Sequence, residues 1–123
     1  KAQQLKKIDS SGKVFVIDWG QKPKICDLVI NTTSVGLTKD QNLGLDFKDY
    51  DNNKKALFYD IIYNPEKTLL LNLAEKYELK IMNGSEMNLL QAVLAFKYVV
   101  NTVDKNIDPE KAMREIVKKK WTQ

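Results

Sequence analysis

Residues 56–83, ALFYDIIYNPEKTLLLNLAEKYELKIMN, contain the strongest structural pattern of this sequence. Residues 56–63 form an apolar run with the aromatic and β-branched side chains that favour a buried strand. Asn64 and Pro65 then predict the start of a helix, because asparagine caps helices and proline suits their first turn. Leucines at helical spacing follow, and residues 80–83 predict another strand. A strand, a helix and a strand within so short a span indicate a βαβ unit with parallel strands.

The N-terminal side of this unit extends the same alternation. Two short apolar runs predict further strands, Val14–Ile17 and Asp27–Asn31. Lys1–Ile8 has the apolar spacing of a helix, while residues 37–55 are polar and predict a loop with few apolar anchors. The sequence therefore predicts an α/β fold in which a parallel sheet is flanked by helices.

Two helices are predicted on the C-terminal side. Residues 86–100 are apolar almost all round, which predicts a helix that is buried on most sides. Asp108 and Pro109 predict the cap and first turn of an amphipathic helix that continues to about Lys120.

The composition is that of one globular domain. The chain has 123 residues, of which 43% are hydrophobic and 29% are charged. No apolar run approaches the roughly 18 residues of a membrane span, so we expect no membrane partner. Histidine is absent, which excludes histidine-based acid–base catalysis and histidine metal ligands within this chain. Cys26 is the single cysteine and cannot form an intrachain disulfide, which favours a reduced, cytoplasmic setting.

The net charge is +4, and Arg114 is the only arginine among the basic residues. We interpret this charge as a solvated, lysine-rich surface. A basic nucleic-acid module is the alternative, but the densest run, Lys118–Lys120, has one aromatic neighbour and no recognisable motif. We therefore expect no nucleic-acid partner.

Three places combine polar side chains with the ends of predicted strands or with an apolar helix. Small polar residues follow the strand 27–31 in the segment Asn31–Gly36, which suits a planar ligand or phosphate and equally suits a plain turn. Tyr63 ends the strand 56–63 at the edge where open α/β sheets bind ligands, or simply packs there. Gln91 lies within the apolar helix, where its amide needs partners from a neighbouring loop or from a ligand.

These places belong to three longer motifs, DLVINTTSVGL at 27–37, DIIYNPEKTLLL at 60–71 and NGSEMNLLQAVLAF at 83–96. Their order and spacing resemble the C-terminal half of shikimate dehydrogenases, over roughly residues 1–100. That family shows Asp-Leu-Ile-Ile-Asn-Ala-Thr-Ser-x-Gly-Met, then Asp-x-x-Tyr-x-Pro-x-x-Thr, then Gly-x-Gly-Met-Leu-x-x-Gln. The resemblance implies a partial Rossmann-like, doubly wound parallel sheet.

The resemblance also implies roles for individual residues. Tyr63 would touch bound shikimate, and Gln91 would hydrogen-bond the ring hydroxyls of shikimate. Glu86 stands where the family has a glycine, so a carboxylate enters the nicotinamide side of the site. The cofactor-binding residues implied by the resemblance are Asn31, Thr32, Thr33, Ser34, Gly84 and Met87.

The activity implied by the resemblance is the reversible, NADP-dependent reduction of 3-dehydroshikimate to shikimate in aromatic amino-acid biosynthesis. The family's catalytic lysine and aspartate and its glycine-rich phosphate turn are not in this sequence, so no catalytic residue and no metal ligand is assigned. We expect residues 1–123 to be the C-terminal portion of a nicotinamide-dinucleotide-binding domain, inactive alone. Its helices, within residues 86–120, would pack toward the substrate cleft. A quinate/shikimate dehydrogenase that uses NAD and a non-catalytic nucleotide-binding domain remain the alternatives.

The doubly wound strand order 3-2-1-4-5-6 has a consequence for the sheet edge. Under the resemblance, Val14–Ile17 is strand three and Leu28–Asn31 is strand four, and the strands between them are not in this sequence. The edge of strand four would then carry unpaired backbone groups. Direct pairing of the two strands, cover by another chain, or packing outside the sheet would each resolve this. We favour a second copy, and hence a homo-oligomer, covering this edge.

Overall fold

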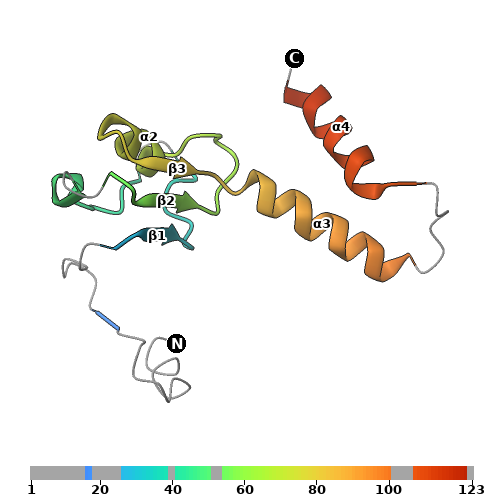
Figure 1. Ribbon diagram of the computed structural model, residues 1–123, viewed down its shortest axis with the longest axis horizontal. Helices are drawn as coiled ribbons and strands as arrows, with labels where there is room; N and C mark the ends of the chain where they lie inside the picture. Colours follow the sequence, from blue (N-terminus) through green and yellow to red (C-terminus); the bar gives the residue numbers. More distant parts are fainter. Residues whose placement is uncertain (1–15, 18–25, 39–40, 51–53, 101–106, 122–123) are drawn as a thin grey trace.

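A computed structural model of the chain describes residues 16–17, 26–38, 41–50, 54–100 and 107–121. Its centre is a three-stranded parallel sheet in the order β1-β2-β3 (Figure 1). The strands are β1 (Leu28–Asn31), β2 (Leu57–Asp60) and β3 (Lys80–Met82). The predicted α/β fold with parallel strands is confirmed, and the strand order agrees with strands four, five and six of the doubly wound fold.

Helix α2 (Leu69–Lys76) connects β2 to β3 and packs against both strands, which confirms the βαβ unit. The predicted helix start at Asn64 and Pro65 is wrong. The Asn64–Pro65 peptide bond is cis and lies in a turn, and Thr68 caps α2 by accepting a hydrogen bond from the backbone N–H of Leu71.

The strand predicted to run to Tyr63 ends earlier, at Asp60. The backbone N–H of Ile61 still donates to the carbonyl of Asn31 at 3.2 Å. The next N–H, of Ile62, donates instead to the Asp60 side chain at 3.0 Å, so this N–H takes no part in the sheet ladder. Tyr63 therefore lies in the turn beyond the strand.

The core lies between one face of the sheet, α2 and the short 3-10 helix η1 (Phe47–Tyr50). Phe58 of β2 is fully buried, with ring centroids 5.3 Å from Phe47 and 5.1 Å from Tyr50. Burial raises the pKa of the Tyr50 hydroxyl, and its hydrogen bond with the Cys26 sulfur acts in the same direction. The loop expected over residues 37–55 therefore contains a short helix, in which Phe47 is buried as an expected apolar anchor and Tyr50 is a core residue that was not expected.

The opposite face of the sheet is largely uncovered among the described residues. Side chains alternate along a strand, so Val29 packs against the core while Leu28 and Ile30 are 49% and 45% exposed. β1 is also an edge of the described sheet. Val16 and Ile17 have no regular structure; the rest of the predicted strand 14–17 and the predicted helix 1–8 lie outside the described residues.

Helices α3 (Ser85–Val99) and α4 (Pro109–Trp121) pack against each other and run in roughly opposite directions, and the pair extends away from the sheet (Figure 1). Asp108 caps α4 as predicted, because its carboxylate accepts the backbone N–H groups of Glu110 and Lys111. The prediction that the helix over 86–100 is buried on most sides is wrong. Only Val93 of α3 is buried in the described part of the chain, since α4 covers one side and no other described element packs closely on the rest. None of the helices that the structure describes is long and apolar enough to cross a membrane.

Candidate ligand cleft at the carboxyl edge of the sheet

All three strands lead into the same kind of turn. Asn31 and Asp60 are the last residues of β1 and β2, and Asn83 directly follows β3. Each side-chain oxygen accepts the backbone N–H two residues later, at 3.0 Å for Asn31, 3.0 Å for Asp60 and 3.1 Å for Asn83. Because the strands are parallel, these turns lie together at the carboxyl edge of the sheet.

A cleft of about 560 Å³ opens at this edge. Two segments form its walls, one after β1 and one after β2. The cleft therefore combines hydroxyl groups with branched apolar surface, which suits a planar ring with a polar rim. The lining residues are Thr32, Thr33, Ser34, Leu37, Ile61, Ile62, Tyr63 and Asn64.

Four of the residues singled out in the sequence meet in this cleft: Thr32, Thr33 and Ser34 on one wall and Tyr63 on the other. Tyr63 remains 43% exposed, so its ring is accessible to a ligand. The structure therefore brings these residues together at one site. Their contacts with a cofactor or a substrate stay a prediction.

Asn31 lies beneath the cleft and is only 2% exposed. Its amide nitrogen donates to the carbonyl of Val35 at 2.9 Å and to the Asp60 carboxylate at 3.1 Å. Its amide oxygen accepts both the backbone N–H and the hydroxyl of Thr33, at 3.0 and 2.7 Å. With both amide hydrogens and the oxygen occupied, the side chain orients the cleft wall and has no donor to spare for a ligand.

Gly84 packs against the backbone of the segment after β2, which forms the other wall of the cleft. Its backbone N–H donates to the carbonyl of Ile62 at 3.1 Å. A Cβ at this position would lie 1.8 Å from the carbonyl oxygen of Ile61, so the close approach of the two backbones requires glycine. Gly84 therefore shapes the segment that lines the cleft.

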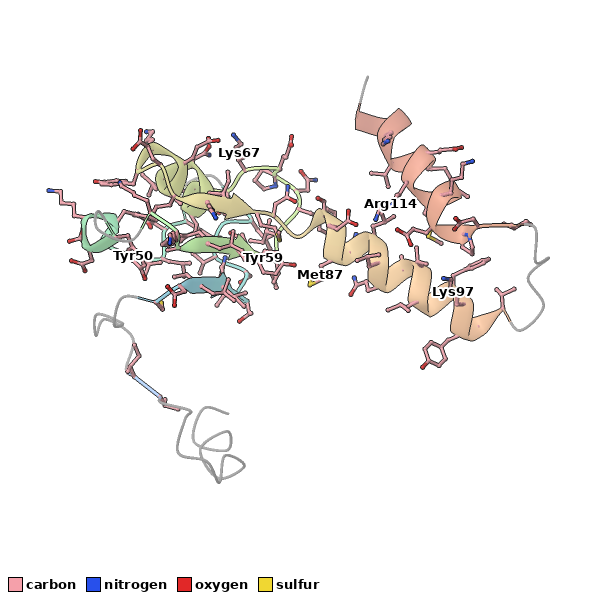
Figure 2. All side chains as sticks on the ribbon, viewed as in Figure 1. Tyr50, Tyr59, Lys67, Met87, Lys97 and Arg114 are labelled. Carbon is pink, nitrogen blue, oxygen red and sulfur yellow. The ribbon has the colours of Figure 1, made fainter. Side chains whose placement is uncertain are left out.

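Met87 and Gln91 do not line the cleft. Met87 lies on the first turns of α3, at the end of the helix nearest the sheet (Figure 2), and is 39% exposed. Gln91 is exposed one turn further along, where its amide nitrogen donates to the Asn88 side chain at 2.7 Å. The prediction that this amide is buried and needs partners from a loop or a ligand is therefore wrong, because water can solvate the exposed side chain.

Sequence reasoning missed two buried polar residues of this site, Asp60 and Thr68. They are 0% and 1% exposed, and the Thr68 hydroxyl donates to the Asp60 carboxylate at 2.7 Å. A usable signal was present, because an acid closing an apolar strand needs hydrogen-bond donors and a threonine before an apolar helix is a cap candidate. The apolar lining residues Leu37, Ile61 and Ile62 carry no comparable signal.

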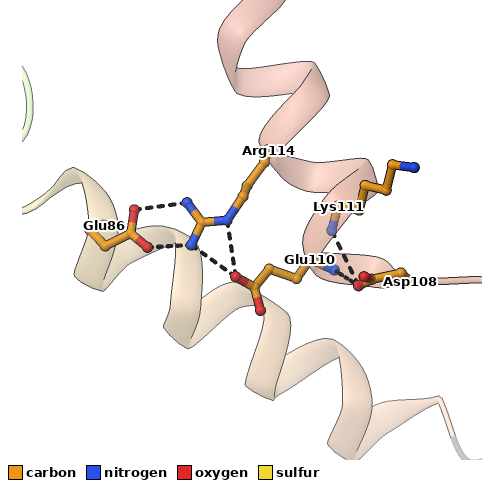
Figure 3. A network of polar contacts seen from close by, with 5 residues as sticks. All are labelled: Glu86, Asp108, Glu110, Lys111 and Arg114. Carbon is orange, nitrogen blue, oxygen red and sulfur yellow. Dashed lines mark hydrogen bonds and ion pairs between the residues drawn. The ribbon is translucent and has the colours of Figure 1, made fainter.

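Glu86, which replaces the glycine of the resemblance, is paired with Arg114. The guanidinium of Arg114 reaches from α4 to both carboxylate oxygens of Glu86 in the first turn of α3 (Figure 3). It also donates from Nε to Glu110 at 3.0 Å. These hydrogen bonds hold the pKa of the Glu86 carboxyl below its ordinary value. The pair links α3 to α4 but is solvent-exposed, so we expect it to contribute little to stability.

Comparison with known proteins identifies relatives of the chain. No family model matches it. The shikimate dehydrogenase (NADP(+)) of Caldicellulosiruptor bescii is 38% identical over 98 residues, which are 77% of this chain and 34% of that protein. The shikimate dehydrogenase (NADP(+)) of Pelagibacter ubique is 34% identical over 110 residues, which are 89% of this chain and 39% of that protein.

A solved structure agrees with these relatives. Shikimate 5-dehydrogenase from Listeria monocytogenes, in complex with shikimate and NAD, superposes with a TM-score of 0.62 at 26% identity, covering 74% of this chain and 30% of that chain. The chain thus spans between a third and two fifths of the two relatives that it matches in sequence. In sequence and in fold, the chain is therefore related to the shikimate dehydrogenases, of whose length it spans only a part.

Proposed function

We propose that the chain is the cofactor-side part of an NADP-dependent shikimate dehydrogenase, whose full-length form reversibly reduces 3-dehydroshikimate to shikimate in the cytoplasm. The observation that carries this proposal is the cleft, where Thr32, Thr33 and Ser34 face the segment of Tyr63 across the carboxyl edge of a parallel sheet. The names of the two sequence relatives support NADP as the cofactor.

The residues of the cleft fit a nicotinamide group. Ile61 and Ile62 on one wall and Leu37 on the other offer apolar surface for the face of a ring, and the hydroxyl groups of Thr32 and Ser34 offer partners for a carboxamide. When bound, such a cofactor supplies the hydride. This chain's residues then hold the ring, orient it toward the substrate and keep water from it.

Tyr63 and Gln91 would bind the substrate under this proposal. Tyr63 brings a phenol to the open side of the cleft, and Gln91 brings an amide whose oxygen can accept a ring hydroxyl. In the full-length enzyme, α3 and α4 would pack toward the substrate cleft, which would cover the apolar side chains that α3 now exposes.

Replacing Gln91 by alanine in the full-length enzyme should raise the KM for shikimate about 2- to 12-fold, because a lost hydrogen bond costs about 0.5–1.5 kcal/mol. The Kd for NADP should stay nearly unchanged. Steady-state kinetics with shikimate and fluorescence titration with NADP measure the two effects. Tyr63→Phe should act in the same direction more weakly, and Lys97→Ala, on the far part of α3 (Figure 2), is the matched control. An equal loss of NADP binding in Gln91→Ala would place this residue outside the substrate site.

The 123-residue chain alone is expected to reduce no NADP with shikimate, because the motifs that carry the family resemblance do not include the catalytic lysine and aspartate of that family. Absorbance at the wavelength of reduced nicotinamide, with enzyme free of host dehydrogenase, measures this. Turnover by the chain alone would refute the assignment of catalysis to other parts of the full-length protein.

Two alternatives remain within reach of the same assays. A quinate/shikimate dehydrogenase that uses NAD would show a higher kcat/KM with NAD and quinate. The Listeria monocytogenes structure, which contains NAD, is the observation that supports testing this alternative. A non-catalytic nucleotide-binding domain would bind a dinucleotide without turnover in the full-length protein.

We also propose that a second copy of the chain covers β1, which is an edge of the described sheet. The exposed side chains of Leu28 and Ile30 on the adjoining face add apolar surface that such a contact could bury. Light scattering that shows a monomer at all concentrations would exclude it.

A further inference from the structure

The Asp60 side chain lies where the two walls of the cleft and the start of α2 meet. It is fully buried and accepts three hydrogen bonds. The amide of Asn31 donates at 3.1 Å, the backbone N–H of Ile62 at 3.0 Å, and the hydroxyl of Thr68 at 2.7 Å. Asn31 is also the register partner of Asp60 in the sheet, so the last residues of β1 and β2 are joined side chain to side chain.

Each of these donors belongs to a different segment of the site. Asn31 holds the turn of Thr33, which lines one wall of the cleft. Ile62 lines the other wall, next to Tyr63. Thr68 caps α2 and accepts the N–H of Leu71 with the same hydroxyl that serves Asp60. One carboxylate therefore connects both walls to the helix behind them.

A polar group in this position needs an explanation other than stability. Among the described residues no lysine or arginine pairs with Asp60, so hydrogen-bond donors alone compensate for the burial of its carboxylate. Buried ionic groups are often no more stabilising than apolar side chains of similar size. Such a group instead fixes the positions of its donors. Each buried donor must point at the carboxylate, because otherwise the donor is left without a hydrogen bond.

We propose that Asp60 is the positioning residue of the cleft. Through Asn31 it sets the wall that contains Thr33, and through Ile62 it sets the wall that contains Tyr63. The significance of this role for catalysis rests on the function proposed above. The role itself is a property of this chain and can be measured without activity.

Amide hydrogen exchange on the 123-residue chain tests the proposal with the variant Asp60→Ala, which removes both carboxylate oxygens, including the one that accepts from Asn31 and Ile62. Exchange protection should fall about tenfold or more at Ile62 and at Thr33, although Thr33 bonds Asn31 and not Asp60. Protection should stay at Leu57 and Lys80, whose N–H groups bond backbone carbonyls at the other end of the strands. Unchanged protection at Thr33, or an equal fall at all four amides of a folded variant, would overturn the proposal.

A second variant keeps the test decisive if Asp60→Ala does not fold. Asn31→Ala breaks the link to one wall and leaves the Asp60 bond to Ile62 in place. Thr33 should then lose protection while Ile62 keeps its own within about twofold. An equal loss at Ile62 would show that Asp60 does not hold the two walls separately, which contradicts the proposal.

Kinetics of the full-length enzyme connect this role to function. Asp60→Ala should raise the KM for NADP and the KM for shikimate together, about tenfold each, whereas Gln91→Ala should raise only the second. If the unmodified full-length enzyme lacks shikimate dehydrogenase activity, the proposed function fails and the exchange result still decides the role of Asp60. If that enzyme is active and both KM values are unchanged in Asp60→Ala, the positioning role is refuted.

Discussion

Replacing Phe58 by alanine is expected to lower the free energy of unfolding by about 3–5 kcal/mol, the usual cost of removing a buried aromatic side chain. Phe58 is 0% exposed and contacts the rings of Phe47 and Tyr50, so its loss leaves a cavity under the centre of the sheet. Small domains have a total stability of only about 5–15 kcal/mol, so this one change should remove a large share of it.

Urea denaturation followed by far-UV circular dichroism measures the loss as a fall in the midpoint at an unchanged slope. Tyr59→Ala is the matched control, because Tyr59 is the next residue of the same strand and faces the opposite, largely uncovered side of the sheet (Figure 2). Its loss should be clearly smaller. Equal losses for the two variants would contradict the assignment of the core to the face that α2 and η1 cover.

Replacing Gly84 by alanine is the second change with a large expected effect, about 3 kcal/mol or more of lost stability. The added Cβ would stand 1.8 Å from the carbonyl oxygen of Ile61 and 2.4 Å from its carbonyl carbon. Both are backbone atoms, so the clash is relieved only by moving the chain between β2 and the cleft. The hydrogen bond from the Gly84 N–H to the Ile62 carbonyl should break as a result.

The same denaturation experiment checks this expectation, with Ser85→Ala as the control at the adjacent position. Ser85 is exposed, and the variant loses only the hydroxyl bond to Asn83, which should cost about 1 kcal/mol or less. A Gly84→Ala variant as stable as Ser85→Ala would show that the backbones do not approach as closely as described.

Local patterns predicted the order and type of the elements well. The strands at 28–31 and 57–60, the helix between β2 and β3, and the capped start of α4 each follow from short-range preferences. Where such a preference acted alone, as with Asn64 and Pro65, it failed. Thr68 also carries a capping side chain, and it prevailed because its hydroxyl has a buried partner in Asp60.

The meeting of the candidate cleft residues was predictable for a related reason. Parallel strands put their carboxyl ends at one edge, so Thr33 and Tyr63 had to lie near each other once the strands were placed. The hydrogen bonds beneath these residues were not predictable, because they depend on the register that sets Asn31 beside Asp60.

The sequence by itself therefore determined the α/β class, the parallel strands and the edge at which the polar turns gather, because strand and helix preferences act over a few neighbouring residues. Only the tertiary structure decided the rest. The Glu86–Arg114 pair joins residues 28 positions apart, the Gly84 backbone meets that of Ile61, and α3 keeps an exposed apolar side. These features arise from the packing of distant segments, whose contacts and burial no local pattern specifies.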